Sequence, residues 1–293
     1  MSEARKIGYT WQAVAYAFAL LISYYVYGFL DYSLSLVLQV LILNAVSTVV
    51  IYCFSYAFDN ASFYDPYWSI QPIITTLFLI IMANEEGDVI RQLMILAVVV
   101  AWGLRLTWNF LRGWKGISHQ DWRYTKLNEA SGKWFPLISF FGIMLFPTLL
   151  VFLGCLPLFE ALGEGQNDFN ILDIIAFVIC LSAFFIQYIS DNQLRKFIKI
   201  REDNSQILNT GLWKYSRHPN YFGEILFWIG IAFFGISTVG DIEWYHVSGV
   251  VSMILLFNFI SIPMQEKQLI ENKPEYYEEI KKRSKLILWF PKK

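Results

Sequence analysis

The chain alternates between long apolar segments and shorter polar connections. Eight apolar segments can be delimited, at residues 11–30, 34–58, 67–83, 90–111, 135–159, 171–190, 221–239 and 244–263. An α-helix needs about 20 predominantly apolar residues to cross the hydrocarbon core of a bilayer. The pattern therefore predicts an all-α fold, a polytopic membrane helix bundle of seven to eight transmembrane helices. We expect residues 1–293 to form a single transmembrane domain.

The composition supports a membrane protein over a soluble one. Hydrophobic residues make up 56% of the 293 residues and charged residues only 16%, whereas soluble domains carry about 25% charged residues. A soluble protein of this length could not bury so much apolar surface. The net charge of −1 gives no positive excess for binding phosphate groups. The lipid bilayer is thus the expected partner, nucleic acid is not, and nothing in the chain indicates an obligate protein partner.

Basic residues are concentrated in alternate connections. Of the 23 lysines and arginines, 21 lie before the first segment, between the fourth and fifth, between the sixth and seventh, or after the eighth. Apart from Arg91, the charged residues of the connections on the opposite side are acidic: Asp31, Glu85, Glu86, Asp88, Glu160, Glu164, Asp168, Asp241 and Glu243. Because cytoplasmic loops are enriched in Lys and Arg, eight crossings would place both termini and the long basic loops in the cytosol. The membrane would be a bacterial inner membrane or the endoplasmic reticulum, and a water-soluble ligand would enter from the cytosol.

Ionisable residues within membrane segments are costly and often mark a function. Three groups of polar residues follow an i, i+4 spacing, which places each group on one helix face: Arg105 and Asn109; Gln187, Asp191 and Arg195; and Asn220 and Glu224. Arg105 could instead extend alone to the interface, and Asp191 with Arg195 could form an ion pair that only orients the helix. Glu224 follows Pro219, a natural first-turn residue, and must face protein or water. A structural partner and a ligand contact both remain open for this carboxylate.

Two further stretches combine aromatic and polar residues. Residues 62–68 read SFYDPYW and include Tyr64 and Asp65, and residues 119–124 read HQDWRY and include Tyr124. Aspartate before proline commonly starts a turn or a helix, so the first stretch can be purely structural. The second could be an interfacial anchor or an aromatic surface for a planar ligand.

The most specific motif occupies residues 211–224, GLWKYSRHPNYFGE. It resembles the signature of the steroid 5-alpha-reductase-like membrane proteins, whose poorly characterised relatives carry SRHPNYFGE at the start of a late membrane helix. Sterol reductases and isoprenylcysteine carboxyl methyltransferases share the shorter RHPxY. Residues 190–195 (SDNQLR) are similar to the Asp-x-x-x-Arg step of the reductases. The resemblance makes residues 135–293 a reductase-like, cofactor-binding half and leaves 1–134 as divergent N-terminal helices.

This resemblance implies a helix bundle that holds NADPH from its cytosolic face. The residues that would contact the cofactor are Gln187, Asp191, Arg195, Tyr215, Arg217, His218, Asn220, Tyr221, Glu224 and Glu266. Two of them depart from the family pattern, since Gln187 replaces an asparagine and Glu266 stands on the last helix, where the steroid reductases have cationic and aromatic residues. No metal site is implied. For the group that polarises the substrate carbonyl, Tyr64 and Asp65 are the candidates, with Tyr124 behind them.

The leading hypothesis is therefore a membrane oxidoreductase that transfers a hydride from NADPH to the activated C=C bond of an apolar lipid or steroid-like substrate. A methyltransferase that uses S-adenosylmethionine is the first alternative, because RHPxY alone fits both classes. A transporter or structural membrane protein, with the polar residues joining helices, is the second alternative. The substrate itself is not specified by the sequence.

Overall fold

A computed structural model describes residues 3–83, 87–163 and 167–287. From the N-terminus its helices are α1 (Glu3–Tyr27), α2 (Leu36–Ala57), η1 (Ala61–Phe63), α3 (Tyr67–Met82), α4 (Val89–Gly113), α5 (Trp122–Ser131), η2 (Gly132–Trp134), α6 (Phe135–Ile138), η3 (Ser139–Leu145), α7 (Phe146–Leu162), α8 (Ile171–Ile200), η4 (Gly211–Lys214), α9 (Pro219–Val239), α10 (Trp244–Leu256), η5 (Phe257–Ser261), α11 (Ile262–Asn272) and α12 (Tyr276–Lys282). These residues contain no β-strand. The predicted all-α bundle is confirmed. Glu85, Glu86 and Glu164, three of the acidic loop residues, lie outside the described ranges.

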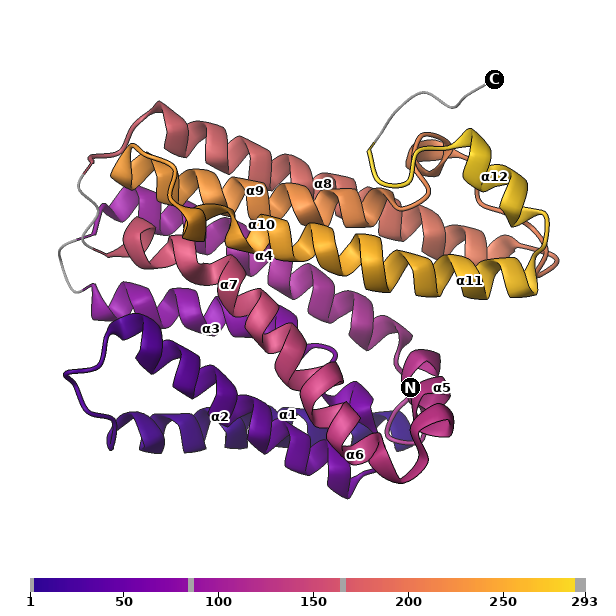
Figure 1. Ribbon diagram of the computed structural model, residues 1–293, viewed down its shortest axis with the longest axis horizontal. Helices are drawn as coiled ribbons and strands as arrows, with labels where there is room; N and C mark the ends of the chain where they lie inside the picture. Colours follow the sequence, from indigo (N-terminus) through magenta and orange to yellow (C-terminus); the bar gives the residue numbers. More distant parts are fainter. Residues whose placement is uncertain (1–2, 84–86, 164–166, 288–293) are drawn as a thin grey trace.

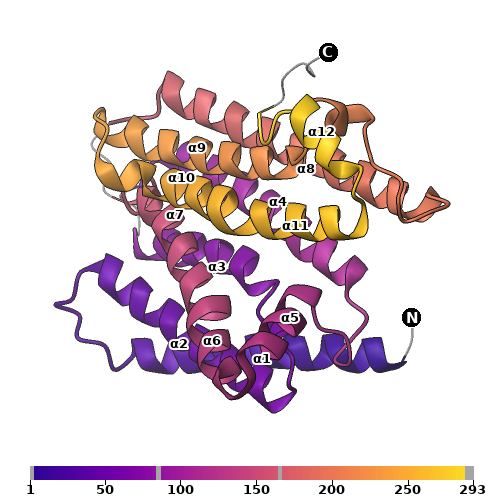
Figure 2. The same cartoon turned by 45° about the vertical axis from the view of Figure 1, so that its right-hand side comes forward.

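The helices run back and forth between two ends of the bundle. In Figures 1 and 2, α2, α4, α8 and α10 all begin at one end, whereas α3, α7 and α9 begin at the other, beside the N-terminus, α5 and α12. We call the first the acidic end and the second the basic end, after the charges that the sequence assigns to their connections. The two loop sets that the charge pattern distinguished thus lie at opposite ends of the molecule.

Six helical stretches are long and apolar enough to cross a membrane: Leu36–Ala57, Val89–Gly113, Trp122–Leu162, Ile171–Ile200, Pro219–Val239 and Trp244–Asn272. The protein is therefore a multi-pass membrane protein. All eight predicted segments are helical, but α1 and α3 do not meet this criterion. With only 16 residues, α3 is shorter than the bilayer core requires. The count of seven to eight crossings therefore stays a prediction for these two helices.

Two of the long helices contain a π-helical segment, η3 before α7 and η5 before α11. Each is followed closely by a proline, Pro147 or Pro263, which cannot donate a backbone hydrogen bond. A wider i→i+5 turn lets the chain continue as a helix past the missing donor. This explains how the fifth and eighth apolar segments stay helical past Pro147 and Pro263.

Small residues bring α8 and α9 into close contact. A Cβ atom at Gly223 would collide with the side chain of Gln187, and one at Gly230 would collide with Cys180. The polar residues that begin α9 are therefore held directly against those of α8. This packing positions the site described below.

Candidate functional site

Polar residues of α4, α8 and α9 meet between these helices toward the basic end. The Asp191 carboxylate accepts hydrogen bonds from Arg105 Nη1 and Asn109 Nδ2, both at 2.5 Å. Asn220 Nδ2 lies 3.4 Å from the other oxygen of Asp191. Arg105 also donates through Nη2 to Gln187 Oε1. We call these five residues the polar cluster, in which members of all three predicted i, i+4 groups converge.

Glu224 lies next to the polar cluster and is 4% exposed. Its two carboxylate oxygens accept hydrogen bonds from the indole nitrogens of Trp102 (3.0 Å) and Trp228 (3.1 Å). The Trp102 ring stacks on Phe227, with centroids 4.6 Å apart. Glu224 thus has structural partners, which the sequence left open. Its contact with a ligand stays a prediction.

Several buried nitrogen donors around the polar cluster have no hydrogen-bond partner within the described part of the chain: Arg105 Nε, Arg112 Nε, Gln187 Nε2 and Arg195 Nε. Arg195 Nη2 donates to the carbonyl of Asn109 at 3.3 Å. A buried donor without a partner costs about 1–3 kcal/mol. Because every unpartnered atom here is a donor, a ligand rich in acceptor atoms fits this surface.

A cavity of about 330 Å³ lies at the basic end, between the last turns of α8, the segment 201–218, α11 and α12. Its basic lining residues are Arg201, Arg217, Lys273 and Arg283. Its large aromatic lining residues are Trp122, Phe197, Trp213 and Tyr276. Asn220 also lines the cavity and reaches Asp191, so the cavity and the polar cluster adjoin. Cations and planar rings together suit a ligand with phosphate groups and an aromatic base.

Three of the predicted cofactor residues form one ion-pair group at the cavity wall. Glu266 pairs with Arg217 Nε at 2.7 Å and with His218 Nε2 at 3.0 Å. Burial lowers the pKa of His218, although the Glu266 carboxylate opposes this shift. Arg217 also donates to the backbone carbonyls of Ile280 and Arg283, both at 2.7 Å. Arg217 therefore fixes the C-terminal segment against α9 and lines the cavity at the same time.

The two predicted cofactor tyrosines lie on either side of this group. Tyr221 accepts a hydrogen bond from Gln265 Nε2 at 2.5 Å, and its ring lies between His218 and Phe257. Tyr215 directly follows η4, and the Lys214 ammonium lies 5.8 Å from its ring centroid. Tyr221 is thus part of the packed core below the cavity, whereas Tyr215 belongs to the loop above it.

The three predicted carbonyl-polarising residues have different surroundings. The Tyr124 hydroxyl donates to Asp65 Oδ1 at 2.5 Å. Burial raises the pKa of Asp65 to about 6, opposed mainly by the positive charge of Arg123. Tyr64 turns away, and its hydroxyl shares a 2.8 Å hydrogen bond with Thr148 Oγ1. Although Tyr64 and Asp65 are adjacent in the sequence, their side chains belong to separate hydrogen-bond networks. Of the two, Asp65 is the one bonded to α5, through Tyr124.

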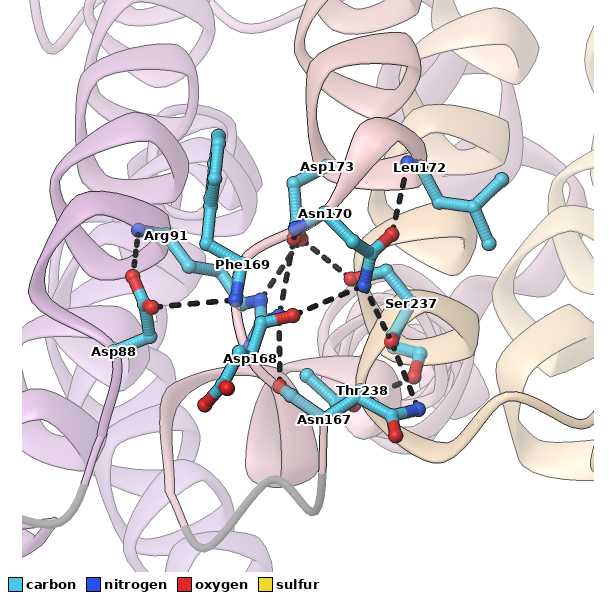
Figure 3. A network of polar contacts seen from close by, with 11 residues as sticks. Asp88, Arg91, Asn167, Asp168, Phe169, Asn170, Leu172, Asp173, Ser237 and Thr238 are labelled. Carbon is cyan, nitrogen blue, oxygen red and sulfur yellow. Dashed lines mark hydrogen bonds and ion pairs between the residues drawn. The ribbon is translucent and has the colours of Figure 1, made fainter.

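A second buried ion pair joins the same helices at the acidic end (Figure 3). Arg91 Nε and Nη2 donate to the two oxygens of Asp173 at 2.8 and 3.0 Å, and Nη2 also donates to two backbone carbonyls of the α7–α8 connection. Asp173 further accepts from Ser237 Oγ (2.5 Å) and from the backbone N–H of Asn170 (2.9 Å). The arginine is 2% exposed and the aspartate 0%.

Several residues of these sites were missed by sequence reasoning. Helix α5 lies in a stretch that the hydropathy pattern assigned to a loop, yet it brings Trp122 to the cavity. Lys273 and Arg283 counted only as cytosolic charges in the sequence. Arg91 counted only as an exception to the acidic connections, although its partner Asp173 is visible within the sixth segment. Periodicity assigns residues to a helix face but does not identify the neighbouring helix.

The chain is similar to a family profile and to a protein of Schizosaccharomyces pombe. The profile of a family described as "Protein of unknown function (DUF1295)" matches residues 51–284. The chain is also similar to the "Uncharacterized protein C594.04c" of Schizosaccharomyces pombe, with 26% identity over 239 residues, which cover 74% of this chain and 69% of that protein. No solved structure matches the chain.

Proposed function

The chain belongs to the DUF1295 family, and from this premise we propose that it is a membrane-embedded reductase. It would transfer a hydride from NADPH to the activated C=C bond of an apolar lipid or steroid-like substrate. The observation that carries the proposal is the convergence of Gln187, Asp191 and Asn220 beside a basic cavity. Asp191 and Asn220 belong to the motifs that resemble the steroid 5-alpha-reductase-like proteins, and Gln187 stands where those proteins have an asparagine.

The residues present fit a dinucleotide phosphate. The buried atoms without partners around the polar cluster are all donors, among the residues that the structure describes, and such a ligand is rich in acceptors. Arg201 and Lys273 would hold its phosphate groups, since cations at a cavity mouth pair with phosphate oxygens. Trp122 and Trp213 would pack against its adenine ring. At about 330 Å³ the cavity is at the small end of ligand sites, about 300–1,000 Å³, so the rest of the ligand would extend past Asn220 to the polar cluster.

When bound, NADPH supplies the hydride. The protein's task is then to orient the nicotinamide, to exclude water and to stabilise the charge that develops on the substrate. Gln187 Nε2 and Arg105 Nε are buried donors without a hydrogen-bond partner among the described residues, and they would have to turn toward the carboxamide to bind it. Glu224 holds Trp102 and Trp228 in fixed positions and so forms the wall of this region.

A hydrogen-bond donor for the substrate carbonyl is provided by the Asp65–Tyr124 pair. The hydroxyl of Tyr124 donates to Asp65 while this carboxyl group is ionised. When Asp65, whose pKa burial raises to about 6, takes up a proton, its O–H can donate to the Tyr124 oxygen, and the Tyr124 hydroxyl is then free to donate to the substrate carbonyl. Helix α5 carries both Tyr124 and the cavity residue Trp122. Tyr64, whose hydroxyl is bound to Thr148, is the second candidate.

The cofactor is tested by thermal unfolding of the detergent-purified protein with NADPH, NADH or S-adenosylmethionine. A ligand at 100 times its Kd stabilises the folded state by about 2.7 kcal/mol. We expect NADPH to raise Tm for the native protein and for Glu160→Gln, a matched control at the acidic end. We expect no such rise for Asn220→Ala or Glu224→Gln. Stabilisation by S-adenosylmethionine alone would support the methyltransferase, and no stabilisation by any ligand would favour a non-enzymatic protein.

The reaction is tested with NADPH that carries deuterium on the transferred face and a panel of steroid, fatty and isoprenoid enones. Deuterium at the β carbon of one product would support reduction and would identify the substrate class. The reductase proposal would be refuted if no enone caused NADPH oxidation and the protein transferred a methyl group from labelled S-adenosylmethionine.

A further inference from the structure

A second cavity, of about 330 Å³, lies where α2 ends beside α6 and η3, toward the basic end (Figures 1 and 2). We call it the α2–α6 cavity. Helix α2 contributes Tyr52, Ser55 and Tyr56 to its lining, and α6 with η3 contributes Phe135 and Ser139. The Tyr52 hydroxyl joins the two sides by donating to the carbonyl of Pro136 at 3.0 Å.

The cavity is also lined by Asp59, which lies two residues past the end of α2. Asp59 has a φ of 47°, in the left-handed region where glycine or asparagine usually follows a helix. Its carboxylate also lies near the negative end of the helix dipole, where a cation would be favoured instead. The side chain is exposed and forms no ion pair or hydrogen bond within the described part of the chain. The local structure therefore gives no reason for a negative charge at this position.

Two serine hydroxyls are free to act in the same cavity. Ser55 and Ser139 are each only 4% exposed, and neither hydroxyl has a hydrogen-bond partner among residues 3–83, 87–163 and 167–287. Unlike the enclosed donors around the polar cluster, both oxygens keep accessible surface. Because the two serines are otherwise buried and both line the cavity, this surface belongs to the cavity.

Aromatic rings form much of the remaining lining. The ring centroids of Tyr52 and Tyr56 lie 6.1 Å apart, and Phe135 adds a third ring. A carboxylate, hydroxyl oxygens and aromatic rings together suit an organic ammonium group. The carboxylate supplies the counter-charge, the rings attract the cation, and the hydroxyls accept hydrogen bonds from its N–H groups. A divalent metal ion prefers a shell of oxygen ligands, which these rings would interrupt.

The surroundings of the cavity suit the head-group region of a bilayer. Tyr56 at the end of α2 is 66% exposed, and Trp134 directly before α6 is 58% exposed. Exposed aromatic residues of this kind gather at membrane interfaces. Lys133, whose ammonium lies 5.7 Å from the Trp134 ring centroid, forms no ion pair with any residue that the structure describes. The acid in the cavity and the lysine beside it therefore complement a head group that carries both an ammonium and a phosphate.

We propose that the α2–α6 cavity binds the head group of a membrane lipid with a primary ammonium, as in phosphatidylethanolamine. The ammonium pairs with Asp59 and donates to serine hydroxyls, and the phosphate lies toward Lys133. A quaternary ammonium, as in phosphatidylcholine, carries the same charge but has no N–H to donate. At about 330 Å³ the cavity is at the small end of ligand sites, so the acyl chains stay in the bilayer.

The proposal does not rest on the proposed reductase function, because none of these residues belongs to the polar cluster or to the predicted cofactor contacts. Its test compares dioctanoyl phosphatidylethanolamine with the phosphatidylcholine and phosphatidylglycerol of equal chain length, with O-phosphoethanolamine and with MgCl2. Thermal unfolding of the delipidated protein in dodecyl maltoside, measured over a range of probe concentrations, gives a Kd for each probe. The proteins are the native chain, Asp59→Asn, Ser139→Ala and Glu129→Gln, a control that removes an exposed acid of α5. NADPH is not added.

We expect phosphatidylethanolamine to raise the Tm of the native protein and of Glu129→Gln, with a Kd at least tenfold lower than that of phosphatidylcholine. Asp59→Asn should weaken the binding of phosphatidylethanolamine at least tenfold. Its Tm without lipid should stay equal or rise, since asparagine suits the left-handed position and carries no charge. Ser139→Ala should reduce the preference for phosphatidylethanolamine over phosphatidylcholine.

The proposal is overturned if phosphatidylethanolamine has no effect on the native protein, or if phosphatidylcholine or phosphatidylglycerol binds as tightly. It is also overturned if Asp59→Asn keeps the native affinity. Equal affinity for O-phosphoethanolamine would assign the cavity to a soluble amine instead of a lipid. Stabilisation by MgCl2 that Asp59→Asn abolishes, without an effect of phosphatidylethanolamine, would assign it to a metal ion.

Discussion

Two buried arginine–aspartate pairs connect α4 to α8, and they differ in how completely the protein satisfies them. At the acidic end, Arg91 and Asp173 bind each other through two hydrogen bonds and are surrounded by further partners (Figure 3). Toward the basic end, Arg105 and Asp191 share one direct hydrogen bond. Arg105 Nε has no partner among the described residues. The same two helices therefore carry one saturated pair and one unsaturated pair.

This difference separates a group that holds the fold together from a group that is available to a ligand. A buried charge pair offsets its desolvation only when further hydrogen bonds satisfy its remaining donors and acceptors. The pair Arg91–Asp173 meets that condition through Ser237, Asn170 and backbone carbonyls. The pair Arg105–Asp191 adjoins an open basic cavity and does not. Four predictions test the distinction.

The largest effect is expected at the saturated pair. Asp173→Ala leaves the Arg91 guanidinium buried without its counter-charge, which typically costs about 3–5 kcal/mol. The free energy of unfolding, measured in detergent by denaturant titration, should fall by this amount. Asp168→Ala removes an exposed carboxylate nearby and should change it by less than about 0.5 kcal/mol. Equal effects of the two substitutions would contradict a structural role for Asp173.

Asp65, a partly buried acid that pairs with Tyr124, tests the distinction through pH. Its carboxyl group has a pKa of about 6 in the folded protein and about 3.9 in the unfolded chain. Between these values the folded state keeps a proton that the unfolded state loses, so stability falls as pH rises from about 4 to about 6 and is constant above. The full difference is at most about 3 kcal/mol. The difference in Tm between the native protein and Asp65→Asn should follow this curve. A Tm difference that does not vary with pH would contradict a raised pKa for Asp65.

The unsaturated pair should affect binding more than folding. Arg105→Gln removes the charge beside the cavity, and we expect the Kd for NADPH to rise at least tenfold, or about 1.4 kcal/mol. The loss of unfolding free energy should be smaller than for Arg91→Gln, because Arg105 makes fewer hydrogen bonds. Isothermal titration and denaturant unfolding measure the two quantities. If Arg105→Gln and Arg91→Gln lost equal unfolding free energy and Arg105→Gln still bound NADPH as the native protein does, the two pairs would not differ in role.

The smallest effect is expected on orientation in the membrane. Arg91 lies at the acidic end, but Asp173 neutralises its charge, so Arg91→Gln should leave the topology unchanged. A reporter that is active only in the cytosol should give signal after Lys293 and within residues 203–206, and none within 241–242, in both proteins. A cytosolic signal from the reporter at 241–242 in the native protein would show that the predicted orientation is wrong.

Much of the fold could be predicted because hydropathy and helical periodicity are local properties. The eight apolar segments are all helical, and the i, i+4 spacing of Asp191, Asn220 and their neighbours correctly indicated shared helix faces. Which faces meet is a property of packing. The contacts of Glu224 with Trp102, and of Arg91 with Asp173, join residues more than 80 positions apart. Neither contact follows from the spacing within one helix.

Helix α5 and a cavity between α1, α2 and α3, lined by Asn44 and Gln71, could not be predicted for related reasons. Asn44 and Gln71 are each flanked by apolar residues in the sequence, and nothing in either segment indicates that they share a cavity. Helix α5 is only 10 residues long and buries no residue completely, so its hydropathy pattern resembles that of a loop. Whether Tyr64, Asp65 and the cofactor residues act as proposed stays a prediction.

The two long helices beside the cavity extend beyond the thickness of a membrane. Helix α8 has 30 residues and Trp244–Asn272 has 29, or about 45 and 43 Å at 1.5 Å per residue. The hydrocarbon core measures about 30 Å, and the last turns of both helices line the cavity. Biological bilayers differ in thickness by only a few Å. An overhang at the basic end would keep the cavity outside the hydrocarbon in thin and thick membranes alike, and hydrophobic mismatch would then tilt the bundle without covering the cavity opening with lipid.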